Sequence, residues 1–381
     1  MSADRSAVRA VMSAARERRV FSAAAWSFGD ADGAWERGML GTRSWGGEEV
    51  SESSTWDLAS VTKPIVAVAV MSLVDTGELT LDDTIAEHLP HYAGTDKAGI
   101  TVRHLLTHTS GIPGQVPLFR DNPTRAALLD AVRELPLIGP LGAQVAYSSQ
   151  GFILLGLIAE HASGLALDVL VRQRVLEPAG MRSTGFGLPG RPQADAVATE
   201  NDPWRGRVVQ GEVHDENAAV LGEPAGHAGL FAPLADVEAL ARALCAAAGG
   251  DTALLSAAGF RTMIRPRTDH LPLRRTLGWQ GVDAEDSPAG DLIGPDGFGH
   301  TGFTGTSLWV DPETARYAVL LTNRVHPSRE GTGISRVRRQ FGNLAFAAAS
   351  TAPSAAPAAP AAAASTAASA AVSTPTHEGV S

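Results

Sequence analysis

The feature that most constrains this chain is a serine and a lysine placed just ahead of an almost uninterrupted apolar segment. Ser60 and Lys63 are followed by residues 65–74, most of which are aliphatic. Pro64 falls in what would be the first turn of a helix, where proline is tolerated, and Gly77 follows as a helix-stopping residue. The stretch predicts a buried helix that begins at or near Ser60, with Ser60 and Lys63 on one face.

Two interpretations of Ser60 are open at this point. A serine oxygen at the positive end of a helix dipole, beside backbone N–H groups without partners, is well placed to act as a nucleophile. The same position also suits an ordinary N-capping serine. Because a Ser-x-x-Lys spacing occurs by chance in many chains, the rest of the sequence has to decide between the two.

Composition excludes several classes of protein. With 381 residues, of which 44% are hydrophobic and 19% charged, the chain predicts a soluble globular protein with a large core. A formal net charge of -10 without a basic block argues against a nucleic-acid partner and against an anionic membrane surface. The single cysteine, Cys245, lies in an Ala/Leu-rich helical run and predicts a core residue, which excludes an internal disulfide and a Cys-based metal site.

The first 28 residues carry five arginines, which interrupt any apolar stretch of signal-peptide length. No run of about 18 apolar residues, the length that a membrane-spanning helix needs, occurs elsewhere. We therefore expect a cytoplasmic protein without a membrane span, with an unusual export route left open.

Both ends of the chain alternate helix and strand patterns, whereas the middle is mainly helical. This predicts an α+β sandwich: one antiparallel sheet from both chain ends (about 1–59 and 270–350), flanked by helices, with an all-helical region of about 60–269 inserted. The Ala/Pro/Ser/Thr-rich remainder, 351–381, predicts a disordered tail. The expected helices are 5–18, 123–134, 151–163, 166–175, 236–248 and 334–349, with a short helix capped by Asp82 or Asp83; the expected strands are 21–28, 35–43, 277–280, 297–302, 307–310 and 317–323.

Two further stretches carry residue types that an activated serine needs. Tyr147-Ser148-Ser149 precedes the apolar helix 151–163, and a tyrosine that faces a lysine can accept a proton, because a nearby cation favours the phenolate. Taken alone, an aromatic residue at the end of a loop more often packs on the core. The glycine-rich stretch 299–305 includes His300 and Thr301, whose polar groups would point into a cleft along a strand edge. Taken alone, it is more often a turn before an edge strand.

Together, Ser60-x-x-Lys63, Tyr147-Ser148-Ser149 and His300-Thr301-Gly302 resemble the three motifs of the serine β-lactamase and penicillin-binding protein superfamily. The tyrosine makes the match most similar to the class C β-lactamase branch, which includes esterases, D-aminopeptidases and penicillin-binding proteins of the 4B type. The resemblance covers roughly residues 10–348 and implies a β-lactamase-like serine hydrolase domain over 1–350. Flanking stretches that resemble the same branch are 58–60, 105–111, 226–231 and 322–324.

The resemblance implies a role for each motif. Ser60 would attack a carbonyl carbon and form an acyl-enzyme, while Lys63 and Tyr147 exchange protons. The backbone N–H groups of Ser60 and Phe303 would form the oxyanion hole. No metal or cofactor is required, and the partner is a small ester, amide or β-lactam-like molecule. The residues expected to bind substrate are Ser149, His300, Thr301, Gly302 and Phe303.

Two positions depart from the class C pattern. Ser149 stands where asparagine is typical, and His300 stands where lysine is typical. A serine cannot donate as an amide does, and a largely neutral histidine anchors a substrate carboxylate poorly. An esterase, amidase or D-amino-acid peptidase therefore fits better than a strong β-lactamase. His326 and Arg329 are candidates for carboxylate recognition instead, although exposed loop charge is the other interpretation.

Other histidines invite a metal interpretation. His104 and His108 have the i, i+4 spacing of a zinc pair, but no glutamate follows His104 as a zinc protease would require. The resemblance explains both as scaffold. It also makes His214-Asp215 and His227 parts of loops that line the cleft, with His227 near the acyl pocket.

The leading hypothesis is a serine hydrolase that cleaves an ester or amide through an acyl-Ser60 intermediate, of esterase, D-aminopeptidase or weak β-lactamase type. One alternative is a transacylase that passes the acyl group to an amine or alcohol in a natural-product pathway. A second is a non-catalytic penicillin-binding or sensor protein. Product analysis with a competing amine separates the first two, and a stable penicillin adduct without turnover identifies the third.

Overall fold

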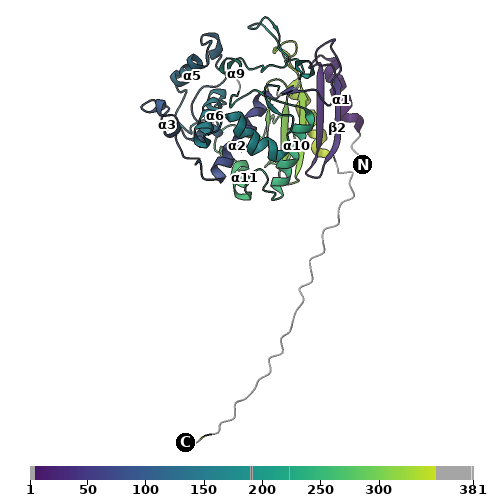
Figure 1. Ribbon diagram of the computed structural model, residues 1–381. Coiled ribbons are helices and arrows are strands. Elements are labelled where there is room, and N and C mark those ends of the chain that lie inside the picture. The colour runs from purple at the N-terminus through teal and green to yellow at the C-terminus, as the bar shows by residue number, and fades with distance from the viewer. Residues whose placement is uncertain (1–4, 189, 191, 223, 349–378, 380–381) are drawn as a thin grey trace. The chain divides into compact units, whose positions relative to one another are not determined.

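A six-stranded antiparallel sheet built from both ends of the chain organises the molecule (Figure 1). The computed structural model describes residues 5–188, 190, 192–222, 224–348 and 379, so the predicted tail, 351–381, lies outside the described residues except for Gly379. The strand order is β2-β1-β11-β10-β9-β8. The strands are β1 (Ala23–Asp30), β2 (Ala34–Gly41), β8 (Gln280–Gly281), β9 (Phe298–Thr301), β10 (Ser307–Asp311) and β11 (Arg316–Thr322).

The two chain ends meet where β1 pairs with β11, from Ala24 opposite Thr322 to Asp30 opposite Arg316. Successive side chains of a strand point to opposite faces of the sheet. Trp26 accordingly packs with α1 (Arg5–Glu17) and α12 (Ile334–Ala347) on one face, whereas α10 (Leu234–Ala248) packs on the other. The predicted α+β fold is thus confirmed, including the contribution of both chain ends.

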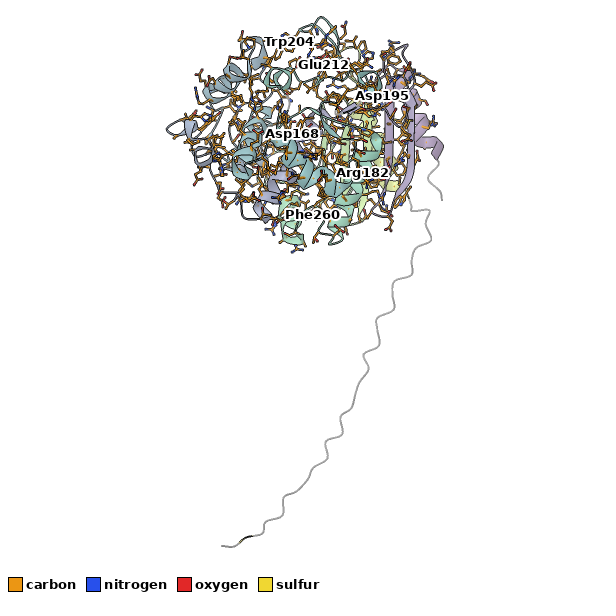
Figure 2. All side chains as sticks on the ribbon, viewed as in Figure 1. Asp168, Arg182, Asp195, Trp204, Glu212 and Phe260 are labelled. Atoms are coloured by element: carbon orange, nitrogen blue, oxygen red, sulfur yellow. The ribbon has the colours of Figure 1, made fainter. Side chains whose placement is uncertain are left out.

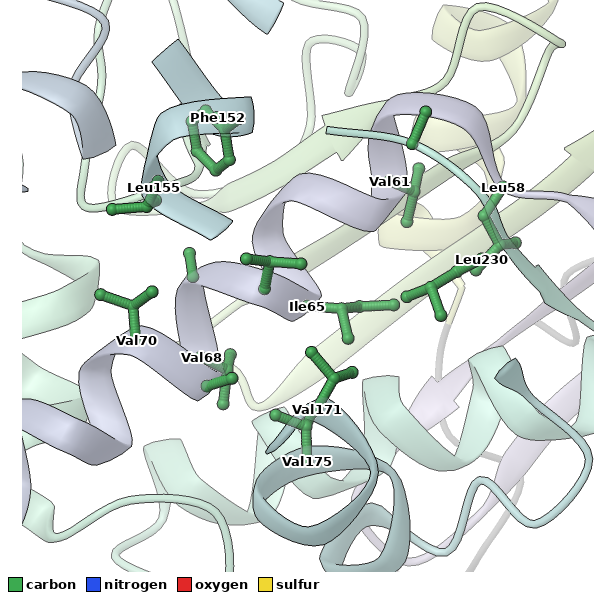
Figure 3. Close-up of a cluster of buried hydrophobic side chains, with 14 of the residues drawn as sticks. Leu58, Val61, Ile65, Val68, Val70, Phe152, Leu155, Val171, Val175 and Leu230 are labelled. Atoms are coloured by element: carbon green, nitrogen blue, oxygen red, sulfur yellow. The ribbon is translucent and has the colours of Figure 1, made fainter. Parts of the chain in front are cut away.

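The helix predicted to follow Ser60 is α2, Thr62–Asp75, and a 3₁₀ turn, Ala59–Val61, leads into it. Twelve of its 14 residues are buried, from Thr62 to Leu73. Phe152 and Leu155 of α6 pack on one side of α2, and Val171 and Val175 pack on another (Figure 3). A helix that is apolar on all sides belongs in the core, which is where α2 lies.

The inserted region is not all-helical, so that part of the prediction is wrong. In its described part it contains four short strands: β7 and β4, which form a three-stranded sheet with β3 from just before the region, and β5 and β6, which pair with each other. Strands of two or three residues are too short to leave a periodic pattern. The strands are β3 (Trp56–Asp57), β4 (Gly185–Phe186), β5 (Asn201–Asp202), β6 (Arg207–Val208) and β7 (Leu230–Ala232). The helices are α3 (Ile85–His88), α4 (Val102–Leu106), α5 (Arg125–Glu134), α6 (Ser149–Ser163), α7 (Leu167–Val171), α8 (Glu177–Ala179), α9 (Glu216–Leu221) and α11 (Ala257–Ile264), with a π-helical turn at Arg172–Leu176 and 3₁₀ turns at Pro90–Tyr92, Leu118–Arg120 and Gln193–Asp195.

Two local expectations also need correction. Thr84 caps α3 in a capping box with Glu87, whereas the Asp83 carboxylate accepts hydrogen bonds from the N–H and the hydroxyl of Thr80. The strand expected at 277–280 is mostly a turn, because Gly278 has a left-handed φ of +86°.

No single helix in the described part of the chain is both long and apolar enough to cross a membrane. Only α6 taken together with 167–179 reaches the required length and composition, and this pair is bent by 81°.

Candidate active site

Ser60 lies where two cavities meet. The smaller lobe, of about 290 Å³, also contains Ser149 and Asp215 in its lining, and the larger lobe, of about 620 Å³, contains Tyr147 and His300. Both lobes share Ser60, Gln115 and Phe303. A still larger cavity, of about 700 Å³, lies in the segment 269–295 and contains none of the predicted site residues. The sequence-predicted residues therefore gather around a smaller but continuous opening.

Lys63 is held against Ser60 from the first turn of α2. Its Nζ donates to Ser60 Oγ at 3.1 Å and to the carbonyl oxygen of His227 at 3.0 Å. The side chain of Lys63 is fully buried, with Nζ 4.9 Å from the centroid of the Tyr147 ring. An amine in this position can exchange a proton with the serine hydroxyl without moving.

The backbone that presents Ser60 is strained. Ala59, directly before it, has a left-handed φ of +47°, which is uncommon for a residue with a side chain. Its N–H donates to Asp57 Oδ1 at 2.7 Å, and the other oxygen of Asp57 accepts from the N–H of His214 at 2.7 Å. Burial raises the pKa of the Asp57 carboxyl, although these hydrogen bonds oppose the rise. Asp57 therefore ties the turn before Ser60 to the loop that contains His214.

The stretch after β9 is fastened to the same turn. Thr306 Oγ1 donates to the carbonyl oxygen of Leu58 at 2.9 Å, and Thr304 Oγ1 donates to that of Asp57 at 2.8 Å. A Cβ on Gly302 would lie 2.0 Å from Thr306 Oγ1 and 2.5 Å from the Leu58 oxygen, so only glycine allows this approach. The backbone N–H groups of Ser60 and Phe303 have no hydrogen-bond partner among the described residues.

The second stretch, Tyr147 to Ser149, enters the cavity from the start of α6. Ser148 caps this helix by accepting from the N–H of Gly151 at 3.0 Å, and its own N–H donates to His108 Nδ1 at 3.1 Å. The Tyr147 ring packs against His108, with 4.7 Å between ring centroids. Ser149, 6% exposed, lines the smaller lobe. His108 therefore contacts both Tyr147 and Ser148 and holds this stretch in place.

His300 is neutral in this structure. Its Nδ1 donates to the carbonyl oxygen of Thr301 at 2.8 Å. Burial, reinforced by the nearby Lys63, lowers the pKa of His300 to about 3. His300 and Thr301 both line the larger lobe, but at neutral pH the imidazole brings no positive charge to it.

The structure separates the two residues that we considered for carboxylate recognition. His326 is buried and lines neither lobe, because Nδ1 donates to the Thr199 oxygen and Nε2 accepts the N–H of Trp45. That expectation is wrong for His326. Arg329 does line the smaller lobe, where it binds the carboxylates of Glu200 and Glu216.

The four other histidines named in the sequence analysis also have structural partners. His104 forms a capping box with Thr101, whereas His108 is turned toward Ser148. No cluster of metal-ligating side chains occurs among the described residues. His214 and His227 instead contact carboxylates, at Glu200 and Asp215 respectively.

Sequence reasoning missed a cluster of arginines in the larger lobe. Arg275, Arg324 and Arg338 line it, and no aspartate or glutamate does. Among the described residues, none of the three arginines forms an ion pair. Arg338 Nη2 donates to the carbonyl oxygens of Gly302 and Thr306, at 2.7 and 2.9 Å, and burial, reinforced by Arg324, lowers its pKa to about 9. No local pattern connects three arginines so far apart in the sequence.

The smaller lobe has an aromatic rim. Phe303, 41% exposed, stacks on His214 with 5.7 Å between ring centroids. Phe119 lines the lobe, and its ring contacts Trp204, which lies at the periphery of the molecule (Figure 2). Sequence reasoning placed Trp204 in a loop-rich region without connecting it to the cavity.

A family model described as Beta-lactamase matches residues 8–342. The chain belongs to the beta-lactamase family. The match spans all three stretches around Ser60, and members of this family are serine hydrolases.

A curated relative and two solved structures agree with this assignment. The relative, "Putative D-alanyl-D-alanine carboxypeptidase" of Escherichia coli (strain K12), is 30% identical over 310 residues, which are 73% of this chain and 71% of that protein. "EstCE1, a hydrolase with promiscuous acyltransferase activity" has a TM-score of 0.73 at 20% identity, covering 90% of this chain and 98% of that one. The octameric penicillin-binding protein homologue from Pyrococcus abyssi has a TM-score of 0.72 at 20% identity, covering 90% and 77%. At such identities, the two structures establish the fold.

Proposed function

We propose that the chain cleaves an ester or amide bond through a covalent acyl-Ser60 intermediate. The observation that carries the proposal is the contact of 3.1 Å between Lys63 Nζ and Ser60 Oγ at the junction of two open lobes. As the uncharged amine, Lys63 accepts the hydroxyl proton while Ser60 Oγ attacks the carbonyl carbon, and the resulting ammonium then gives this proton to the leaving group. A water molecule then attacks the carbonyl carbon of the acyl-enzyme, and its proton passes through Lys63 to Ser60 Oγ. This releases the carboxylic acid and restores Ser60. Tyr147, beside Lys63, takes part in these proton transfers.

The negative charge that develops on the carbonyl oxygen needs donors that are already in place. The N–H groups of Ser60 and Phe303 have no partners within the described part of the chain, which supports their assignment as the oxyanion hole. Thr304 and Thr306 hold these two segments together through Asp57 and Leu58. The donors are thus positioned before substrate arrives.

A specific observation favours a second candidate, a carboxypeptidase-like activity on a substrate with a free carboxylate. Arg275, Arg324 and Arg338 give the larger lobe a positive charge that no carboxylate in its lining neutralises. Guanidinium groups bind carboxylates through charge-assisted hydrogen bonds, and the Escherichia coli relative carries a carboxypeptidase name. Under this candidate, Arg275→Gln lowers turnover of an N-acetylated D-alanyl-D-alanine about tenfold or more relative to p-nitrophenyl acetate.

The central test compares wild type with Ser60→Ala on p-nitrophenyl acetate, D-alanine p-nitroanilide, N-acetylated D-alanyl-D-alanine and a penicillin. The matched control is Ser72→Ala, because Ser72 is a buried serine on α2, the helix that follows Ser60, and its hydroxyl donates to the Ala69 oxygen. We expect Ser60→Ala to lose about a thousandfold or more of any activity and Ser72→Ala to retain it. Activity that survives in Ser60→Ala contradicts the proposal.

Mass spectrometry of the stopped reaction adds a direct readout. An acyl adduct on the peptide that contains Ser60 is expected with ester substrates. Adding an amine acceptor to the same reaction separates hydrolysis from acyl transfer by the ratio of acid to amide product. A penicillin adduct that persists without any turnover of the panel identifies a sensor instead.

A further inference from the structure

The carboxylate of Asp215 lies in the lining of the smaller lobe, together with Ser60. Two groups hold it in place: His227 Nε2 at 3.0 Å and the backbone N–H of Ala218 at 2.9 Å. Both contact the same oxygen, Oδ1. Asp215 is therefore fixed on one side by a buried histidine and by the N-terminus of α9, and its orientation does not depend on substrate.

The other oxygen, Oδ2, is left for a ligand. It makes no hydrogen bond with the described residues, and the Asp215 side chain is 34% exposed. Burial opposes ionisation of this carboxyl, but His227, the Ala218 N–H and Lys63 outweigh it and hold its pKa well below the usual value. Asp215 thus presents an ionised oxygen to the cavity at neutral pH.

The other charges of this lobe have partners or lie at its rim. Glu216 is bound to Arg329, and Arg329 is shared with Glu200, so one guanidinium serves two carboxylates. Arg120 is exposed, and its guanidinium packs over the Phe119 ring. In the described structure, Asp215 is accordingly the carboxylate of this lobe that is not bound to an arginine or lysine.

We infer that Asp215 is a specificity-determining residue that binds a protonated amine on the substituent of the substrate occupying the smaller lobe. The inference rests on the proposed hydrolase function, because Ser60 lies between the lobes. Oδ2 accepts a hydrogen bond from the ammonium group, and the charge pair forms in a partly enclosed site where it is screened less than at the surface. The arginines of the larger lobe disfavour an amine there, so the two lobes distinguish the two ends of a substrate.

The test uses two matched pairs of esters, since the structure leaves open which side of the scissile bond enters the smaller lobe. D-alanine methyl ester and methyl isobutyrate differ by an ammonium against a methyl group on the acyl side. 2-(Dimethylamino)ethyl acetate and 3-methylbutyl acetate differ by a protonated tertiary nitrogen against a CH group on the alcohol side. The quantity measured is the ratio of kcat/KM, amine over neutral, within each pair.

Asp215→Asn keeps the shape of the side chain and an acceptor for the Ala218 N–H, but removes the charge. We expect it to lower the amine-over-neutral ratio about tenfold or more in one of the pairs. Glu216→Gln is the matched control, because the Glu216 carboxylate is already bound to Arg329, and it is expected to change the ratio less than about threefold. Unchanged ratios in Asp215→Asn overturn the inference, as does an equal change in Glu216→Gln.

Failure of the inference and failure of the hydrolase proposal are distinguishable. If hydrolysis of p-nitrophenyl acetate depends on Ser60 but Asp215→Asn leaves both amine-over-neutral kcat/KM ratios unchanged, only the inference fails. If no Ser60-dependent hydrolysis exists, binding of the same four compounds to Ser60→Ala, with and without Asp215→Asn, is measured by calorimetry. An amine that binds no better than its neutral partner then overturns the inference by itself.

Discussion

Two parts of the site are built in different ways. One part, which we call the floor, is α2: it carries Lys63, and its buried residues pack on α6 in the apolar core. The walls are loops joined by charges, such as Arg329 between Glu200 and Glu216. Under the proposed function, the floor would fix Lys63 by close packing, and the walls would present the side chains that recognise a substrate. Chemistry and specificity would then belong to different parts of the molecule, which can be perturbed separately.

The largest effect is expected at the floor. Lys63→Met keeps most of the buried volume but removes the amine that contacts Ser60 Oγ and the His227 oxygen. We expect kcat on p-nitrophenyl acetate to fall about a hundredfold to ten-thousandfold, as for loss of a general acid–base group. The matched control is Lys97→Met, because Lys97 is a second buried lysine whose Nζ contacts Asp96 and not Ser60. Equal losses in both variants would mean that burial of a lysine, and not its contact with Ser60, is what matters.

A smaller effect is expected at Gly302, where the stretch after β9 contacts the turn that presents Ser60. Gly302→Ala places a Cβ 2.0 Å from Thr306 Oγ1 and 2.5 Å from the Leu58 oxygen, so β9 has to move away from the turn that presents Ser60. A displacement near 1 Å costs about a hundredfold in rate, and kcat should fall by about that much. Gly33→Ala, in a turn where a Cβ meets nothing within 4 Å, should keep wild-type activity. Equal kcat values for wild type and Gly302→Ala would show that this contact does not position the site.

The same contrast explains what the sequence could predict about the fold. The sheet from both chain ends and the buried helix after Ser60 follow from long, regular hydrophobic patterns, and both are confirmed. The sheets β3-β7-β4 and β5-β6 were not predicted, because strands of two or three residues are too short to show a hydrophobic period. Thr84 rather than Asp83 caps α3, a choice that depends on backbone geometry at a single residue.

The site residues that could be predicted are likewise those that lie in a local sequence pattern. Ser60, Lys63, Tyr147 and His300 could be named because each lies in a short local pattern. The structure places Ser60, Tyr147 and His300 in the lining of one cavity, with Lys63 Nζ against Ser60 Oγ. The arginines of the larger lobe could not be named, since residues from distant segments meet only after folding. His326 shows the opposite error, in which a polar residue near a motif suggested a binding role but is occupied by backbone partners. The roles assigned to these residues remain predictions for the experiments above.

The smallest expected effect is a change in how stability depends on pH, and it is expected at His300 in the lining of the larger lobe. Its folded-state pKa of about 3 lies below the usual 6.5, so the unfolded chain binds a proton between these values while the folded protein does not. Its contribution to stability is therefore fully present above pH 6.5 and is lost as pH falls toward 3. His300→Gln removes this proton uptake, so its free energy of unfolding should fall less steeply than that of wild type over this range, as measured by urea denaturation at several pH values. Parallel curves would mean that His300 takes up its proton at the same pH in the folded and unfolded states, so that the larger lobe would carry a fourth cation only below about pH 6.5.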